Sequence, residues 1–165
     1  MILQSLPTIR KARPGEEAEL HEAHMRSIRE VCSKDHTPLE ISGWGHRPLG
    51  NRWTAAIERD QVLVAEFDGQ VLGVGHLGVL PNNPEEGHIY ALYLTPETTR
   101  MGVGAEMANQ LLDYARSKGV KVVRLYSTLT AHKFYQRLGF VDEGEMQTMM
   151  IGGNPVRCYP MVKSL

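Results

Sequence analysis

Two glycines, Gly102 and Gly104, stand between an apolar stretch at residues 88–94 and a long stretch of helical periodicity. A strand that runs through a glycine turn into a helix leaves free backbone N–H groups at the positive end of the helix dipole, where a phosphate binds favourably. Because glycine has no side chain, a pyrophosphate can approach this backbone closely. The segment therefore predicts a binding site for a ligand that carries a nucleotide.

Two common phosphate-binding loops do not fit this segment. The P-loop has a Lys and then Ser or Thr after its second glycine, whereas Gly104 is followed by Ala105 and Glu106. The dinucleotide fingerprint has three glycines, and it opens a strand–helix–strand unit. This chain has two glycines here, and roughly half of the sequence precedes the strand. A different nucleotide-bearing ligand is indicated.

A second motif follows at residues 134–140, with the sequence Phe-Tyr-Gln-Arg-Leu-Gly-Phe. In this order, the two motifs resemble those of the GNAT superfamily of acyl-CoA-dependent N-acyltransferases. That family has a Gln/Arg-x-x-Gly-x-Gly/Ala loop and then a short helix with a Phe-Tyr pair followed by Gly-Phe. Residues 99–104 match at both glycines, but Thr99 stands in place of the opening Gln or Arg, and Arg100 follows it. The resemblance extends from about residue 8 to the end, with its specific motifs between residues 88 and 140.

The resemblance implies acetyl-CoA as co-substrate. Its pyrophosphate is expected on a loop made of Thr99, Arg100, Met101, Gly102, Val103, Gly104 and Ala105. The backbone of Leu92, Tyr93 and Leu94 is expected to pair with the pantetheine arm like an added strand, and one of its N–H groups could polarise the thioester carbonyl. Thr130 and Lys133 are expected near the adenosine end, although Lys133 could equally be a solvated charge on a helix.

Acyl transfer to an amine requires a proton acceptor, because a lysine-like ammonium has a pKa of about 10.4. The family often places a Glu for this task on the fourth strand, just before an Ile. The matching residue here is His88, and a histidine with a pKa near 6.5 is a competent base at neutral pH. Glu86 on the same strand face is the alternative base, and a water chain is a third. His88 could also be an ordinary strand-edge histidine.

Tyr135 is the candidate acid. CoA leaves as a thiolate, and a thiol has a pKa near 8.5 against about 10 for a phenol, so a phenol close to the sulfur can donate a proton or a hydrogen bond. A Tyr at this place in the second motif often takes that role in the family. The alternative is a tyrosine that only packs against the cofactor, and Phe134 and Phe140 are expected in the core.

The acceptor site is less defined. In the family, the segment corresponding to residues 27–53 shapes it, which makes His36, Trp44, Arg47 and Trp53 candidates for substrate binding. Each of them is also plausible as a packing residue. Small amines, amino acids, antibiotics, peptide N-termini and protein lysines all remain open as acceptors. Cys32 as a covalent acyl carrier is not favoured, because the family usually transfers the acyl group directly in a ternary complex.

Composition narrows the class of protein. With 165 residues, 42% of them hydrophobic, residues 1–165 are expected to form a single domain without metal or disulfide support. A net charge of −1 without a basic cluster argues against nucleic acid. No signal peptide is expected, no apolar run reaches about 20 residues, and two cysteines fit a reducing compartment, so a cytoplasmic protein is expected. His21 and His24 lack His-Glu-x-x-His spacing, and no metal is expected.

The remaining pattern predicts an α/β (α+β) fold of the GNAT type, with a mixed, mostly antiparallel sheet of about seven strands and about four helices. Strands are expected at residues 8–13, 62–67, 71–80, 87–94, 120–127, 140–151 and 156–162, and residues 81–84 as a loop. Helices are expected from about residue 14 to 32, at 102–118 and at 130–138, with shorter ones after Pro38 and at 52–59.

The expected activity is transfer of an acetyl group to a primary amine of a small molecule, peptide or protein. Two alternatives remain at this point, a non-catalytic acyl-CoA sensor and a transferase for a longer acyl group. A homodimer is a reasonable default for such an enzyme.

Overall fold

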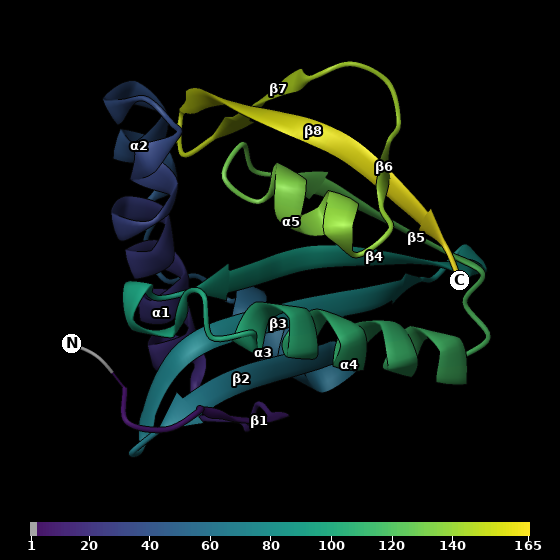
Figure 1. The fold of residues 1–165 in the computed structure, drawn as a ribbon, viewed down its shortest axis with the longest axis horizontal. Coiled ribbons are helices and arrows are strands. Elements are labelled where there is room, and N and C mark those ends of the chain that lie inside the picture. Colours follow the sequence, from purple (N-terminus) through teal and green to yellow (C-terminus); the bar gives the residue numbers. More distant parts are fainter. Residues whose placement is uncertain (1–2) are drawn as a thin grey trace.

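The computed structural model describes residues 3–165. Within this range the chain forms five α-helices, two short 3-10 helices and eight strands (Figure 1). The strands are β1 (Thr8–Lys11), β2 (Gln61–Phe67), β3 (Gln70–Leu80), β4 (Asn83–Leu94), β5 (Val122–Ser127), β6 (Val141–Asp142), β7 (Gln147–Ile151) and β8 (Asn154–Ser164). The α-helices are α1 (Glu17–Glu30), α2 (Pro38–Trp44), α3 (Arg52–Arg59), α4 (Val103–Ser117) and α5 (His132–Arg137).

The strands form one sheet in the order β1-β2-β3-β4-β5-β8-β6, and β7 pairs with β8 outside that order. Every pair is antiparallel except β4 with β5, which run parallel and are connected by α4. The predicted fold class, a mixed and mostly antiparallel sheet flanked by helices, is confirmed.

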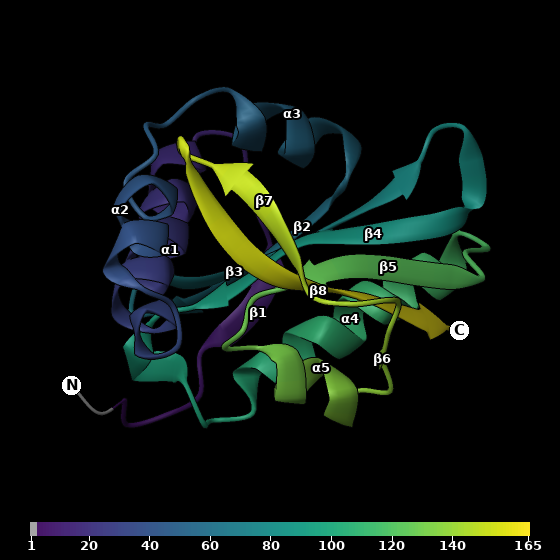
Figure 2. The same ribbon diagram turned by 90° about the horizontal axis from the view of Figure 1, so that it is seen from above.

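Helices cover both faces of this sheet. Figure 2 shows α3 on one side and α4 with α5 on the other. The alternation along β2 explains this arrangement, because Leu63 and Ala65 pack in the cluster that contains α4, while Val62 and Val64 pack with α1 and α3. A third cluster joins α1 and α2 to β8. Apolar side chains and helices therefore cover both faces of the sheet, and the candidate site lies where β4 and β5 separate.

Several boundaries differ from the sequence-based prediction. Residues 81–84 were expected as a loop, but β4 already begins at Asn83, because Asn83 pairs with Leu80 of β3. A register shift next to this pair leaves Pro84, which has no N–H to donate, without a partner on β3. The strand expected at residues 140–151 is divided into β6 and β7, because the chain turns at Gly144, which has a φ of +92°. The hairpin turn at Asp68 and Gly69 is confirmed, with φ of +51° and +78°, as a two-residue hairpin requires.

Candidate active site

The parallel pair β4 and β5 separates partway along its length. Pairing ends at Ile89 with Leu125, yet β4 continues to Leu94. Just beyond the last pair, Tyr90 is the extra residue of a β-bulge, because Ile89 faces Leu77 and Ala91 faces His76. A bulge bends its strand and ends pairing. The β5-facing edge of β4 is therefore free of strand pairing from Tyr90 onward.

Three adjacent spaces surround this opening. The slot is a narrow space of about 20 Å³ lined by Ile89, Tyr90, Ala91, Leu92, Tyr93, Tyr126, Thr128, Ala131 and Tyr135. The loop cavity, of about 530 Å³, lies between residues 99–105, the end of β4 and the start of α5. The second cavity, of about 180 Å³, is bounded by α1, α2, α3, β4, β5, β7 and β8. Tyr93 and Thr128 border all three, so the slot and the two larger spaces are adjacent at these residues.

The loop before α4 presents an unusual run of backbone donors. Arg100 and Gly102 adopt left-handed conformations, with φ of +65° and +79°. Within residues 3–165, none of the N–H groups from Arg100 to Ala105 has a hydrogen-bond partner, and the first helical bond is Glu106 N to Gly102 O at 3.1 Å. Six free N–H groups at the N-terminus of a 15-residue helix make a site for an anion such as a pyrophosphate.

The glycines of this loop keep the approach open. No atom lies within 4 Å of a Cβ built on Gly102, so a side chain there would fill the space beside the free N–H groups. A Cβ on Gly104 would meet Leu94 Cδ1 at 3.2 Å and Phe134 Cε1 at 3.3 Å. In addition, Thr130 Oγ1 is buried without a partner among the described residues and borders the loop cavity. These features fit a CoA-type ligand.

Most of the residues predicted for the cofactor lie around the loop cavity. Those that border it are Leu92, Tyr93, Leu94, Thr99, Arg100, Gly102, Gly104, Ala105 and Thr130. Met101 and Val103 instead pack into the core cluster beneath it. Lys133 is exposed and does not border the cavity, so its predicted place near the adenosine end stays a prediction. Phe134, expected to be core only, also lines the cavity.

Tyr135 lines the slot at the point where the two cavities meet. Its ring is held edge-on between Phe134 and Phe140, with centroid distances of 5.2 and 5.5 Å. Burial raises the pKa of its phenol well above the ordinary 10. The hydroxyl is therefore protonated at neutral pH, which is the state a proton donor requires.

His88 borders the second cavity from β4, and its ring lies between those of Tyr90 and Tyr126, at centroid distances of 4.6 and 5.7 Å. Burial lowers its pKa below 6.5, so the imidazole is neutral and able to accept a proton at pH 7. Glu86 is on the same strand, as expected, but its carboxylate accepts a hydrogen bond from Arg124 at 2.7 Å. It does not border the cavity.

The four predicted acceptor-binding residues do not gather at one place. Trp44 and Arg47 border the second cavity, whereas Trp53 is packed in the core cluster beneath α3 and borders only a neighbouring space. His36 borders none of these cavities, because both of its ring nitrogens are occupied inside the protein.

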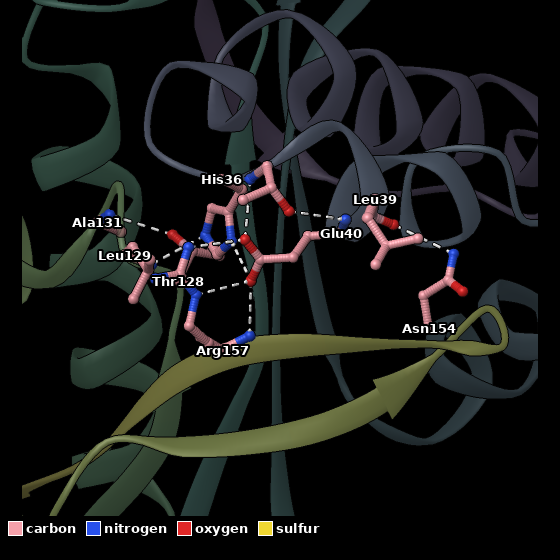
Figure 3. Close-up of polar contacts among 9 residues, drawn as sticks. His36, Leu39, Glu40, Thr128, Leu129, Ala131, Asn154 and Arg157 are labelled. Carbon is pink, nitrogen blue, oxygen red and sulfur yellow. Dashed lines mark hydrogen bonds and ion pairs between the residues drawn. The ribbon is translucent and has the colours of Figure 1, made fainter.

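Figure 3 shows the polar cluster that holds His36. Its Nε2 accepts from Leu129 N at 3.1 Å, so Nδ1 carries the hydrogen and donates to Glu40 Oε2 at 3.2 Å. Glu40 also accepts from Thr37 N at 2.9 Å and from the backbone and guanidinium of Arg157. Arg157 thereby holds the pKa of the Glu40 carboxyl well below 4.5. The cluster fixes α2 against β8, one wall of the second cavity.

The residues of the second cavity that were not among the sequence-based site candidates include His24 from α1, Arg52 from α3 and Tyr126 from β5. His24 is buried, and its ring contacts that of Tyr93 in a tilted arrangement at a centroid distance of 4.3 Å. Its spacing from His21 was a signal for one helix face, but the sequence held no indication that this face meets β4.

Cys32 borders the loop cavity, but its thiol is not reactive enough to carry an acyl group. Burial raises the pKa of its thiol to about 12, so the nucleophilic thiolate is scarce at neutral pH. This agrees with direct transfer to the acceptor.

Comparison with known proteins identifies the class of this fold and site. Residues 21–140 match the acetyltransferase (GNAT) family. The chain belongs to this family.

Curated relatives are only moderately similar. The chain is 30% identical over 143 residues to the mycothiol acetyltransferase of Stackebrandtia nassauensis, over 81% of this chain and 44% of that protein. It is 30% identical over 91 residues to an uncharacterized N-acetyltransferase of Archaeoglobus fulgidus, over 51% of this chain and 62% of that protein. It is 31% identical over 103 residues to the amino-acid acetyltransferase of Pseudomonas syringae pv. syringae, over 61% and 23%. The chain thus spans less than two thirds of each of these relatives.

Solved structures share the fold. A GCN5-related N-acetyltransferase from Rhodopseudomonas palustris superposes with a TM-score of 0.83 at 23% identity, covering 100% of this chain and 99% of that one. The yncA protein of Salmonella typhimurium, solved with acetyl-CoA, gives a TM-score of 0.73 at 20% identity, covering 98% and 95%. None of the helices in residues 3–165 is long and apolar enough to cross a membrane.

Proposed function

We propose that this acetyltransferase moves an acetyl group from acetyl-CoA to a primary amine by direct attack. The observation that carries the proposal is that the loop cavity and the second cavity meet at the slot, where Tyr135 lies. One cavity has the donors for a pyrophosphate, and the other has a neutral imidazole. This arrangement suits a ternary complex in which donor and acceptor enter from different sides.

The acetyl-CoA, when bound, supplies an acetyl group on a thioester. The free N–H groups of residues 100–105 hold its pyrophosphate, and the unpaired edge of β4 from Tyr90 to Leu94 aligns its pantetheine arm. An N–H group on this edge polarises the thioester carbonyl. His88 accepts the proton from the amine, directly or through water, and Tyr135 donates a proton to the departing sulfur.

The names of the curated relatives indicate a class of acceptor but no particular molecule. The chain resembles proteins that acetylate amino acids and proteins named mycothiol acetyltransferases, over part of their lengths. These names agree with a small-molecule amine as acceptor. They do not by themselves choose one.

The test begins with a calorimetric titration of acetyl-CoA, followed by CoA-thiol release against a panel of amines. We expect binding, and release that depends on an amine. Tyr135→Phe is expected to lower kcat by on the order of 10²-fold with little change in the affinity for acetyl-CoA, because only proton donation is lost.

Tyr114→Phe is the matched control, since it removes a phenol on α4 that borders none of the three spaces. Failure to bind acetyl-CoA would refute the donor. Binding without turnover on any amine would favour an acyl-CoA sensor. Turnover only with longer acyl-CoA donors would favour a transferase for a longer acyl group. A full kcat in Tyr135→Phe would reject the acid role.

A further inference from the structure

The second cavity has a one-sided charge. The described side chains that line it include three arginines, Arg47, Arg52 and Arg157, and no Asp or Glu. This contrasts with the chain as a whole, whose net charge is −1. A small cavity whose charged lining residues are all cations favours an anionic ligand.

Arg157 is neutralised within the protein, but the other two arginines are not. Arg157 Nη2 contacts Glu40 Oε1 at 2.9 Å. Across residues 3–165, no carboxylate lies within 4.0 Å of the guanidinium of Arg47 or Arg52. Each makes a hydrogen bond only to a backbone carbonyl, Arg47 Nε to Trp44 O at 2.9 Å and Arg52 Nη2 to Tyr90 O at 3.3 Å. A guanidinium has five N–H donors, so most of theirs are uncommitted.

Both side chains are held in place rather than extended into solvent. His21 Nε2 donates to the backbone carbonyl of Arg47 at 2.8 Å, which fixes the segment between α2 and α3. The guanidinium of Arg52 lies over the ring of Trp53, 4.4 Å from its centroid. Both arginines are half-buried, and burial lowers the pKa of each. Burying two unpaired cations is costly unless a partner binds between them.

The position of these cations relative to the proton acceptor limits the ligand. Arg47 and Arg52 line the same cavity as His88, and its volume is about 180 Å³. A molecule that presents its amine to His88 and an oxyanion to the arginines must therefore be small. Arginine binds carboxylates in a bidentate manner, which orients as well as attracts them.

We propose that Arg47 and Arg52 bind an oxyanion of the acceptor, and that the acceptor is a small amine with a carboxylate, such as a free amino acid. This inference rests on the proposed function, because it describes the acceptor of that reaction. It excludes protein lysines and the N-termini of proteins as preferred acceptors, since they carry no carboxylate near the reacting nitrogen.

The test compares each standard L-amino acid with its carboxamide, which has a similar shape but carries a neutral amide in place of the carboxylate. Acetylated products are quantified by mass spectrometry with acetyl-CoA, and binding is measured by ligand-observed NMR with CoA. The wild type is expected to favour the preferred acid over its amide by roughly 10- to 100-fold in kcat/KM, the range for a charge-assisted pair. Arg47→Met and Arg52→Met, which keep the apolar stem, should each reduce that ratio to within about threefold.

Arg116→Met is the matched control, because Arg116 is exposed on α4 and paired with Asp113 at 3.0 Å; it should leave the ratio unchanged. The inference is overturned if amides or peptide amines react as well as the acids, or if the arginine variants slow both equally.

The NMR arm separates this inference from the proposed function. If no amine is acetylated, the proposed function fails. Acids that bind the wild type but not the Arg47→Met/Arg52→Met double variant would still support the anion site. Equal binding of acids and amides, or no binding of either, would overturn it.

Discussion

The loop cavity and the second cavity share the slot, but they are built in different ways. The loop cavity is bordered by one contiguous segment, residues 99–105, whose backbone N–H groups from Arg100 onward have no hydrogen-bond partner within residues 3–165. The second cavity is defined by side chains from seven elements, including two guanidinium groups, of Arg47 and Arg52, that form no ion pair within residues 3–165. One half of the site therefore needs little more than two glycines and a helix N-terminus, whereas the other depends on each residue that lines it.

This contrast indicates how a shared donor and a varied acceptor can coexist in one fold. A backbone site tolerates different side chains, as Thr99 in the place of Gln or Arg illustrates. A side-chain site changes its ligand with each substitution. Substitutions should therefore separate into those that remove donor binding and those that change acceptor preference.

The largest effect is expected for Gly102→Val. The φ of +79° is strained for a β-branched residue, and the side chain would project beside the free N–H groups. Loss of two or more charge-assisted hydrogen bonds, each about 1.5–3 kcal/mol, corresponds to on the order of 10³-fold weaker acetyl-CoA binding by calorimetry.

Gly119→Val is the matched control at the other end of α4. Gly119 has a φ of +82° and also has no atom within 4 Å of a built Cβ. Both variants should lose similar stability, about 1–2 kcal/mol, but only Gly102→Val should lose acetyl-CoA. Equal loss of binding in the two would mean that helix strain, not the phosphate site, is measured.

The same contrast explains what the sequence could predict. Gly102, Gly104 and Tyr135 belong to short contiguous motifs, and the structure brings all three to the loop cavity or the slot. The bounds predicted for α3, residues 52–59, are also those observed, since this helix is defined by local periodicity. Local patterns therefore sufficed for the donor half.

The acceptor half depends on how separate elements meet, which local patterns do not encode. Arg52 was missed although Trp53 beside it was considered, because the orientation of α3 places the arginine in the second cavity and the tryptophan in the core. Likewise, Lys133 lies on a six-residue helix whose rotation turns it to solvent. His36 is withdrawn into a polar cluster by contacts with residues far along the chain.

A smaller effect is expected for His88→Gln. A base that must be neutral loses activity as pH falls through its folded pKa, and burial puts that pKa below 6.5. The wild-type profile of kcat/KM should therefore have an acidic limb below pH 6.5. His88→Gln should remove this limb and lower kcat/KM at neutral pH by on the order of 10²-fold.

Glu86→Gln is the comparison that assigns the base. Because Arg124 already holds the Glu86 carboxylate at 2.7 Å, its loss should change kcat/KM by less than about threefold. Glu86 raises the pKa of His88 through its charge, so the acidic limb should move slightly lower in this variant. A large loss in Glu86→Gln with a normal His88→Gln profile would reverse the assignment.

An effect on catalysis smaller than that of His88→Gln is expected for Glu40→Gln, which tests whether acceptor binding in the second cavity depends on the polar cluster that holds α2 against β8. Glu40 Oε2 accepts from His36 Nδ1 and from Arg157 N and Nε, and an amide nitrogen there would face these donors. We expect about 2–3 kcal/mol lower unfolding free energy at pH 7, measured by denaturant titration. The KM for the acceptor should rise by about tenfold as α2 loosens from β8, with the affinity for acetyl-CoA within about threefold.

The pH dependence of that stability difference supplies its control. The folded pKa of Glu40 is lowered by Arg157, so its contribution is fully present above the ordinary value of 4.5 and is lost as pH falls toward the folded pKa. The wild type and Glu40→Gln should therefore converge in stability below pH 4.5. A stability gap that persists at acidic pH would assign the loss to packing.

Equal weakening of acetyl-CoA and acceptor binding in Glu40→Gln would show that the loop cavity and the second cavity are not independent, because the cluster also anchors Leu129, close to Thr128 and Thr130 of the loop cavity.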